Sequence, residues 1–114
     1  MKKNGYDWAK ELPCGVTVCD KEAKIIYIND RAAKTFAKYG DSLTGHSLYE
    51  FHGERAAGMI NQMLTTGSTN SYTIEKEGQK KLIHQMPWYN DGIVAGLVEL
   101  SLVIPFEMPH FIRK

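Results

Sequence analysis

Apolar and polar side chains alternate most clearly over residues 78–104, near the C-terminal end of the chain. The two halves of this stretch are rich in β-branched and aromatic residues, and the turn sequence Asn-Asp-Gly at residues 90–92 separates them. This arrangement is typical of two long antiparallel strands joined by a tight turn. Residues 71–76 form a similar run and precede a Glu-Gly turn at residues 77–78. The pattern therefore predicts three consecutive antiparallel strands.

A shorter hairpin is predicted in the first third of the chain. Residues 15–20 and 25–28 are strand-like runs on either side of a short polar connection. Asn29 or Asp30 then offers a side-chain oxygen that can cap a helix. We expect this helix to end at Gly40, in the left-handed conformation that glycine adopts easily.

Further helices are predicted on both sides of this region. Apolar residues recur at three- and four-residue steps over residues 54–66, which indicates a helix ended by Gly67. Residues 41–51 have no long period, and we expect one or two short turns of helix there. Residues 6–12 place Tyr, Trp, Ala and Leu at near-helical spacing before Pro13. They predict a short amphipathic helix that docks on its own domain or on a partner copy.

These elements divide the chain into three parts. Strands near both ends with helices between them favour an α+β domain with an antiparallel sheet, over residues 13–104. An N-terminal cap helix is expected within residues 1–12. Residues 105–114 contain two prolines and are expected to form an extended tail.

Composition and charge narrow the class of protein. The 114 residues suffice for one domain, and contents of 43% hydrophobic and 24% charged residues are ordinary for a soluble globular protein. A net charge of +1 gives no electrostatic footprint for nucleic acid. The best apolar run, residues 93–106, is broken by a charge and is shorter than the ~20 residues of a membrane span. No secretory signal is present at the N-terminus, so we expect a cytoplasmic protein.

The two cysteines are expected to remain reduced. If the segment between them is extended, the Cα atoms of Cys14 and Cys19 lie about 16 Å apart, which is too far for a disulfide bond. We interpret both as small buried or half-buried residues, and no metal site is expected around them.

With its elements in this order and spacing, the chain resembles a PAS domain, a small sensory module of signalling proteins. The resemblance covers about residues 12–104 and is carried by Gly15-Val16-Thr17-Val18-Cys19-Asp20, Ile25-Ile26-Tyr27-Ile28-Asn29, Ala32-Ala33, Gly45, and Asp91-Gly92 through Gly96-Leu97-Val98-Glu99. It implies a five-stranded antiparallel sheet with helices packed on one face, often around a cavity for a small molecule or cofactor. It also implies a homodimer formed through the outer face of the sheet and the N-terminal helix.

The chain departs from the family pattern at its last strand. The usual exit motif, a sequence like Asp-Ile-Thr, is replaced by Val103-Ile104-Pro105. No kinase, cyclase or DNA-binding sequence follows within these residues. We therefore expect any signal to pass to a partner in trans or through a change in dimer geometry.

Six residues are candidate contacts for a ligand or cofactor: His52, Met59, Met63, His84, Met86 and Trp88. His52 comes just before the helix over residues 54–66 and can point into a cavity. Because haem-binding PAS domains ligate iron through such a side chain, the resemblance makes it a candidate axial ligand, although a surface or hydrogen-bonded histidine is the plainer interpretation. Met59 and Met63 either line a deformable pocket or belong to the core.

The other three candidates lie on the first long strand of the C-terminal hairpin. Side chains alternate along a strand, so His84, Met86 and Trp88 share one face and Gln85 lies on the other. The first set offers one polar group among bulky apolar ones, as a ligand pocket does. The alternative is that Met86 and Trp88 are core and that His84 bonds a helix carbonyl.

The last strand supplies a candidate dimer surface. Leu97, Glu99, Ser101 and Val103 share one face, and this broad mixture of apolar and polar groups suits a two-fold interface. Val98 begins the opposite, purely aliphatic set.

No catalytic motif is present. The chain lacks the Gly-x-Ser-x-Gly elbow, the His-Glu-x-x-His zinc motif and the phosphate-binding glycine motifs. Neither cysteine lies in the flavin-binding sequence Asn-Cys-Arg-Phe-Leu-Gln, and the cofactor is left open. We predict a sensory and dimerising module without catalysis. The alternative is a haem-binding sensor with His52 or His84 as axial ligand, and a small hydrolase or isomerase has no residue set to support it.

Overall fold

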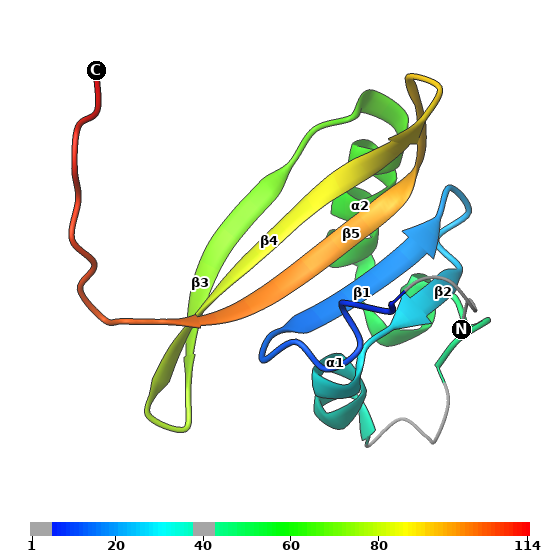
Figure 1. Cartoon of the computed structure of the whole chain (residues 1–114). Coiled ribbons are helices and arrows are strands. Elements are labelled where there is room, and N and C mark those ends of the chain that lie inside the picture. The colour runs from blue at the N-terminus through cyan, green and yellow to red at the C-terminus, as the bar shows by residue number, and fades with distance from the viewer. Residues whose placement is uncertain (1–5, 38–42) are drawn as a thin grey trace.

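The computed structural model of the chain describes residues 6–37 and 43–114. It contains one five-stranded antiparallel sheet with the helices on one face (Figure 1). The elements in chain order are β1 (Gly15–Asp20), β2 (Ile25–Ile28), α1 (Asp30–Thr35), the 3₁₀ helix η2 (Leu48–Phe51), α2 (Glu54–Thr66), β3 (Asn70–Lys76), β4 (Gln79–Asn90) and β5 (Ile93–Ile104). The predicted α+β class and the antiparallel sheet are confirmed.

The first and last strands meet in the middle of the sheet. The spatial order is β2-β1-β5-β4-β3, so β5 lies between β1 and β4. Val18 faces Val98 across the β1–β5 pair, and β4 and β5 are the longest strands. Both C-terminal hairpins have the predicted turns, because Asp91 and Gly92 have φ values of 53° and 78°, and Glu77 and Gly78 have similar positive values.

The helices largely follow the sequence pattern. α2 spans Glu54–Thr66, and Gly67 caps it with a φ of 78° and an N–H bonded to the Met63 carbonyl. The short turn expected within residues 41–51 is η2, whose cap Ser47 forms a capping box with Glu50. α1 ends at Thr35, which is earlier than expected, and the predicted stop at Gly40 lies outside the described residues.

The predicted N-terminal helix is wrong over the residues that the structure describes. Residues 8–11 form turns, closed by the Lys10 N–H on the Asp7 carbonyl at 3.1 Å and the Leu12 N–H on the Ala9 carbonyl at 3.3 Å. An α-helix would pair the Ala9 carbonyl with the N–H of residue 13, which is proline and has none. That carbonyl bonds instead to a side chain elsewhere in the fold. Residues 1–5 of the predicted cap helix lie outside the described residues.

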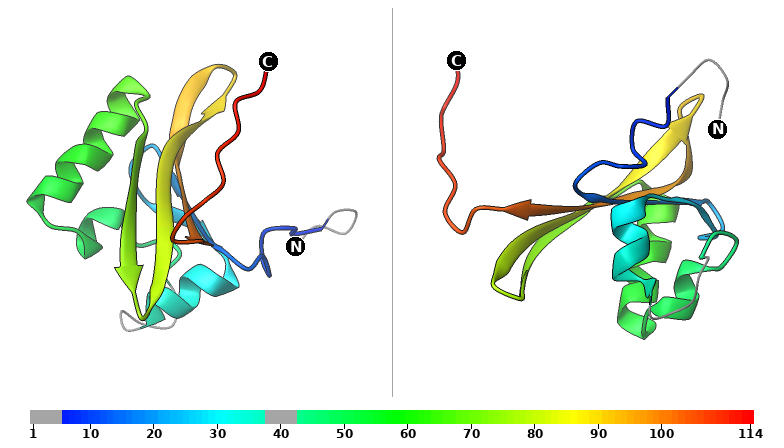
Figure 2. Two further views of the ribbon diagram at one scale, coloured as in Figure 1. Left: turned by 90° about the vertical axis from the view of Figure 1, so that its left-hand side faces the viewer. Right: turned by 60° about the horizontal axis from the view of Figure 1, so that its bottom comes forward.

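Neither end of the described chain belongs to the helical layer, although Lys10 of the N-terminal segment pairs with Asp30 at the start of α1. The N-terminal segment (residues 6–14) crosses the side of the sheet opposite α1 and α2, and the tail (residues 105–114) leaves the end of β5 without helix or strand (Figure 2). Four large apolar side chains of the tail are exposed: Phe106, Met108, Phe111 and Ile112. Among the described residues, no helix has both the length and the apolar character to cross a membrane.

The buried side chain of Asn29 joins three parts of the fold. Its Oδ1 accepts hydrogen bonds from the N–H groups of Ala32, at 3.0 Å, and Val16, at 2.9 Å. Its Nδ2 donates to the carbonyls of Ala9 and Cys14, both at 2.8 Å. The first bond caps α1, as predicted for Asn29 or Asp30, and the others tie the N-terminal segment to the start of β1. Because the residue is 1% exposed, water cannot replace these partners.

We predict that Asn29→Ala lowers the free energy of unfolding by ~2–4 kcal/mol, because it strands several buried backbone donors and acceptors at once. Urea denaturation measures the change. Asn61→Ala, on the exposed side of α2, is the matched control and should stay within about 0.5 kcal/mol of the native chain. Equal stability of the two variants would show that the Asn29 contacts do not hold the fold together.

Candidate functional site

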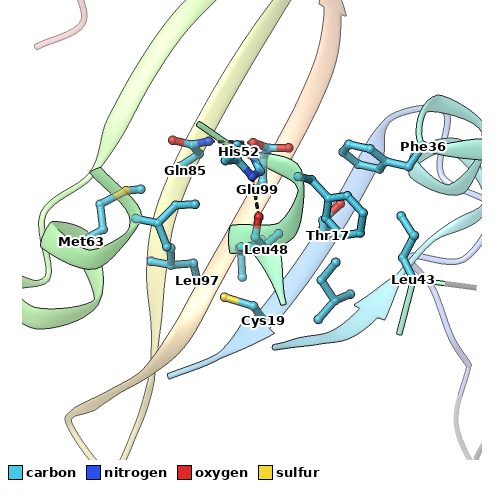
Figure 3. Close-up of a pocket in the computed structure, with 14 residues that line it drawn as sticks. Thr17, Cys19, Phe36, Leu43, Leu48, His52, Met63, Gln85, Leu97 and Glu99 are labelled. Atoms are coloured by element: carbon cyan, nitrogen blue, oxygen red, sulfur yellow. Dashed lines mark hydrogen bonds between the residues drawn. The ribbon is translucent and has the colours of Figure 1, made fainter. Parts of the chain in front are cut away.

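A small apolar pocket lies between the sheet and the helices (Figure 3). Its apolar wall comes from β1, β2, η2, α2 and β5, and includes Cys19, Ile25, Leu48, Ile60, Met63 and Leu97. Four of these side chains, on Cys19, Ile60, Met63 and Leu97, also belong to the main buried core. The pocket is therefore the part of the core that the side chains do not fill. Its cavity volume of about 30 Å³ holds one or two water molecules.

A polar row crosses the floor of this pocket, on the helix-facing side of the sheet. Thr17, Glu99, Gln85 and Asn70 stand side by side on β1, β5, β4 and β3, each directly paired with the next. The Asn70 Nδ2 donates to Gln85 Oε1 at 3.0 Å, and Gln85 Nε2 donates to Glu99 Oε2 at 2.7 Å. These two bonds fix the orientation of the Gln85 amide. The row places one carboxylate at the edge of an otherwise apolar space.

His52 lies over this row, just after η2 (Figure 3). Its Nδ1 is 2.7 Å from the carbonyl oxygen of Leu48. A carbonyl only accepts, so Nδ1 carries the proton and Nε2 of the neutral ring is an acceptor.

Two further hollows adjoin the pocket along the same side of the sheet. One, with a volume of about 330 Å³, shares His52, Ile60 and Gln85 with the pocket and is also lined by Met59 and Tyr72. The other, of about 120 Å³, shares Thr17, Phe36 and Glu99 and is bordered by the basic residues Arg31, Lys76 and Lys81. The polar row therefore runs from one hollow to the other beneath the pocket.

The structure brings together only part of the predicted set of site residues. His52 and Met63 line the pocket, and Met63 is 2% exposed. Met59, one turn earlier on α2, is 36% exposed and lines the larger adjoining hollow instead. A binding role for any of these residues stays a prediction.

The placement predicted for the His84, Met86 and Trp88 row is wrong. Because Gln85 and its partner Glu99 line the pocket, the alternation of side chains puts this row on the opposite, outer face of the sheet. There His84 bonds the Ser71 hydroxyl, and not a helix carbonyl.

Trp88 bridges two strands on the outer face. Its Nε1 donates to the Cys19 carbonyl of β1 at 3.0 Å. The indole reaches it beside Gly96, where a Cβ atom would lie 2.6 Å from Nε1 and 1.9 Å from the Cys19 oxygen. The residue at this position must therefore be glycine for the indole to reach β1.

The predicted dimer surface on β5 is also reversed. Leu97 is 5% exposed and contacts the core, Glu99 lines the pocket, and Ser101 and Val103 line the smaller hollow beside α1. This set faces the helices, so it cannot meet a second sheet. The aliphatic set that begins with Val98 lies on the outer face.

The polar row was missed by sequence reasoning. Strand alternation correctly predicts which side chains share a face with Gln85 on β4 and with Glu99 on β5. It does not predict which of the two faces of the sheet packs against the helices. The direct pairing of Asn70, Gln85 and Glu99 depends on strand register, which two-residue turns fix only once their type is known.

The two cysteine thiols differ in how deeply they are buried. Both are free, with Cys14 half-buried and Cys19 buried in the pocket wall. Burial raises the pKa of the Cys19 thiol above its usual value. Within residues 6–37 and 43–114, no three His, Cys, Asp or Glu side chains come together in a way that could hold a metal ion.

Comparison with known proteins identifies the fold. The sequence profile of the family described as the PAS fold matches residues 9–104. A C-terminal domain from Streptococcus mutans superposes with a TM-score of 0.67 at 19% identity, covering 82% of this chain and 78% of that one. A sensory box sensor histidine kinase from Vibrio cholerae gives 0.64 at 13% identity, covering 83% and 85%. Among curated proteins, no sequence matches the chain.

A further similar structure is the Aer2 receptor from Vibrio cholerae, described as a dual PAS-haem oxygen sensor. Its TM-score is 0.58 at 17% identity, with coverage of 81% of this chain and 95% of that one. At sequence identities this low, the similarity to these structures shows a shared fold and nothing more.

We predict that a thiol reagent such as a nitrobenzoate disulfide modifies Cys14 at least about tenfold faster than Cys19, because Cys19 is both buried and shifted away from its reactive thiolate form. The rates are read from the Cys19→Ser and Cys14→Ser variants, which keep one thiol each. Similar rates in the two variants would mean that the pocket wall opens readily to solvent.

Proposed function

This chain belongs to the PAS-fold family, and from that premise we propose that it is a sensory module that binds a small molecule in the pocket and the larger hollow adjoining it, and that it works as a homodimer. The observation that supports this proposal is the pocket, which has apolar walls and a single row of polar side chains at its edge. Ligand sites in proteins combine these two features, because apolar burial supplies affinity and a few fixed polar groups supply orientation.

The contacts around β1 support a route from the pocket to the surface of the domain. Thr17 and Cys19 line the pocket on one face of β1. The N–H of Val16, on the same strand, bonds Asn29, which also holds the N-terminal segment through Ala9. A ligand that favours one position of β1 would therefore change how firmly that segment is held. It can do so only through a difference in its affinity for the two states.

The outer face of the sheet is the surface we propose for the homodimer. Apolar side chains of β4 and β5 gather on this face beside one another, and all are half-buried in the single chain: Met86, Trp88, Val98, Leu100 and Leu102. The helices cannot cover them because they lie on the other side of the sheet. A second copy that places its own sheet against this face would complete their burial. A signalling partner in trans would then read the geometry of the dimer.

We propose no catalytic role for the domain. The pocket combines one carboxylate, on Glu99, and one imidazole, on His52, with no hydrogen bond between them in the described part of the chain. A serine–histidine contact between Ser71 and His84 lies on the outer face, where no carboxylate of the described residues bonds the imidazole. Neither arrangement activates a nucleophile.

Haem does not fit the pocket. His52 offers a free Nε2 there, but the pocket of about 30 Å³ and the adjoining hollow of about 330 Å³, which His52 also lines, together reach only the lower end of the roughly 300–1,000 Å³ of ligand sites. His84, the other candidate axial ligand, stands on the outer face outside any enclosed space. The fold supports a smaller ligand than a macrocycle.

We predict that a screen of small metabolites finds a compound that raises the melting temperature by roughly 5–15 °C at a hundredfold excess over its dissociation constant. Met63→Trp, which fills the pocket, should abolish the shift. Asn61→Trp, at an exposed position on the same helix that lines neither the pocket nor the adjoining hollow, is the matched control and should keep it. Chemical shifts of Leu97 and Leu48 would locate the bound compound. A complete absence of hits, or equal shifts in both variants, would argue against ligand binding in the pocket.

We predict that Leu100→Lys converts the homodimer to a folded monomer, because it places a charge in the middle of the proposed outer-face interface. Light scattering during gel filtration measures the mass, and circular dichroism checks the fold. Ile93→Lys makes the same chemical change at a 70% exposed position at the start of β5 and should leave the dimer intact. A native chain that is monomeric at high concentration, or a Leu100→Lys dimer, would contradict the proposed interface.

A further inference from the structure

The geometry points to the chemical class of the ligand: we propose that the site takes a small amphipathic cation, with its protonated amine or amidine against Glu99 and its apolar body in the adjoining hollow beside α2. This inference rests on the proposed ligand-binding function and adds the charge of the ligand and its orientation.

The carboxylate of Glu99 is only half-used by the protein. Gln85 Nε2 donates to Oε2 of Glu99 at 2.7 Å. The Gln85 amide cannot turn round to offer its oxygen, because that oxygen already accepts from Asn70 Nδ2 at 3.0 Å. Oε1 of Glu99 has no hydrogen-bond partner in the described part of the chain. An ionised carboxylate only accepts, so this oxygen is available to a donor from water or from a ligand.

Two other polar groups that line the pocket with Glu99, on Thr17 and His52, also have unused acceptor capacity. Thr17 is the direct cross-strand partner of Glu99 and is 6% exposed, and its side-chain hydroxyl, which can both donate and accept, has no hydrogen bond to another of the described residues. The Nδ1 atom of His52 donates to Leu48, which leaves Nε2 as an acceptor. Two acceptors, Glu99 Oε1 and His52 Nε2, and one hydroxyl that can accept or donate thus line one small space. A cationic head with several N–H groups can satisfy them together, and bonds that involve a charge are the stronger kind.

The shape of the site places the apolar body. The enclosed pocket, at about 30 Å³, is too small for more than a minor part of a ligand. The hollow of about 330 Å³ opens beside it along Gln85 and is lined by Met59 and Ile60 of α2 and by Tyr72 of β3. A ring in this hollow would lie between the helix and the sheet with its substituent directed along the polar row toward Glu99.

The negative charge of Glu99 acts on a side chain that lines that hollow. Burial and the negative charge of Glu99 together raise the pKa of Tyr72. On its other side, Arg31, Lys76 and Lys81 border the smaller hollow, but no ion pair within the described residues joins any of them to Glu99. The carboxylate is therefore not neutralised by a fixed partner. The hollow beside α2 has a basic side chain of its own, Arg55, so basic groups lie at both ends of the polar row. Among the described residues that line the pocket and the two hollows, Glu99 is the one carboxylate, and the amine of a cationic ligand is therefore expected there.

Three probes of the same shape test this assignment: benzylamine, which is protonated at pH 7, benzyl alcohol, which is neutral, and benzoate. Their dissociation constants are measured on the purified chain by titration of backbone and side-chain amide chemical shifts. We expect benzylamine to bind at least about tenfold more tightly than the other two. The largest shifts should fall on the Gln85 side-chain amide and on Ile60.

Two variants separate the charge of Glu99 from other causes. Glu99→Gln keeps the shape and removes the charge, and it should reduce the preference for benzylamine to about twofold or less. Glu107→Gln removes one carboxylate from the tail and should leave the preference unchanged. If Glu99→Gln does not fold, Thr17→Val takes its place and should weaken benzylamine by about threefold without affecting benzyl alcohol.

The outcomes distinguish this inference from the function on which it rests. Binding of benzyl alcohol or benzoate in the hollow at least as tightly as benzylamine would overturn the cationic ligand and leave a ligand-binding pocket in place. A preference for benzylamine that survives Glu99→Gln would equally overturn it. No binding by any of the three probes would count against both the cation and the proposed ligand-binding function.

Discussion

The whole arrangement depends on one buried amide, the side chain of Asn29. Its oxygen accepts from the N–H groups that begin β1 and α1, and its nitrogen donates to two carbonyls of the N-terminal segment. A side-chain amide offers two acceptor sites on its oxygen and two donor N–H groups on its nitrogen without a charge, so it can meet all four partners in a site that is 1% exposed. This residue decides how β1 lies relative to α1, and β1 in turn forms one wall of the pocket.

The pocket exists because the sheet and the helices meet along only part of their length. α2 packs Ile60 and Met63 on Cys19 and Leu97, while the middle of the floor is occupied by the polar row. Residues such as Gln85 and Glu99 cannot be covered by aliphatic groups without losing their hydrogen bonds or a share of their hydration. The core therefore stops at the row, and the space above it remains open to a ligand. The same row of polar side chains runs along that space, from Asn70 at one side to Thr17 at the other.

Much of the fold could be predicted from the sequence because local rules settle it. Strand alternation, the Asp91-Gly92 turn and the Gly67 cap are each fixed by neighbours within a few residues, and each was confirmed. The N-terminal helix failed because Pro13 removes a donor and the carbonyl of Ala9 finds a distant one on Asn29. The spacing of apolar residues cannot predict such a competing hydrogen bond from a residue distant in the sequence.

The candidate site was harder to predict for a related reason. Periodicity groups residues by face but does not orient the face, so the row with His84 was assigned to the wrong side and the row with Gln85 was overlooked. The orientation is decided by which strand neighbours which, and that order, with β5 between β1 and β4, brings together residues far apart in the chain. His52 and Met63 were found because they follow helix ends and helix periodicity, which are local.

The central claim is that filling the pocket changes how the N-terminal segment is held, through β1 and Asn29. Amide hydrogen exchange on the protein with and without a bound pocket ligand tests it most directly, at the N–H groups of Val16 and Ala32, which both bond Asn29. The account predicts that their exchange rates change together with that of Leu97 in the pocket wall. A ligand that alters exchange at Leu97 and leaves Val16 and Ala32 unchanged would contradict it.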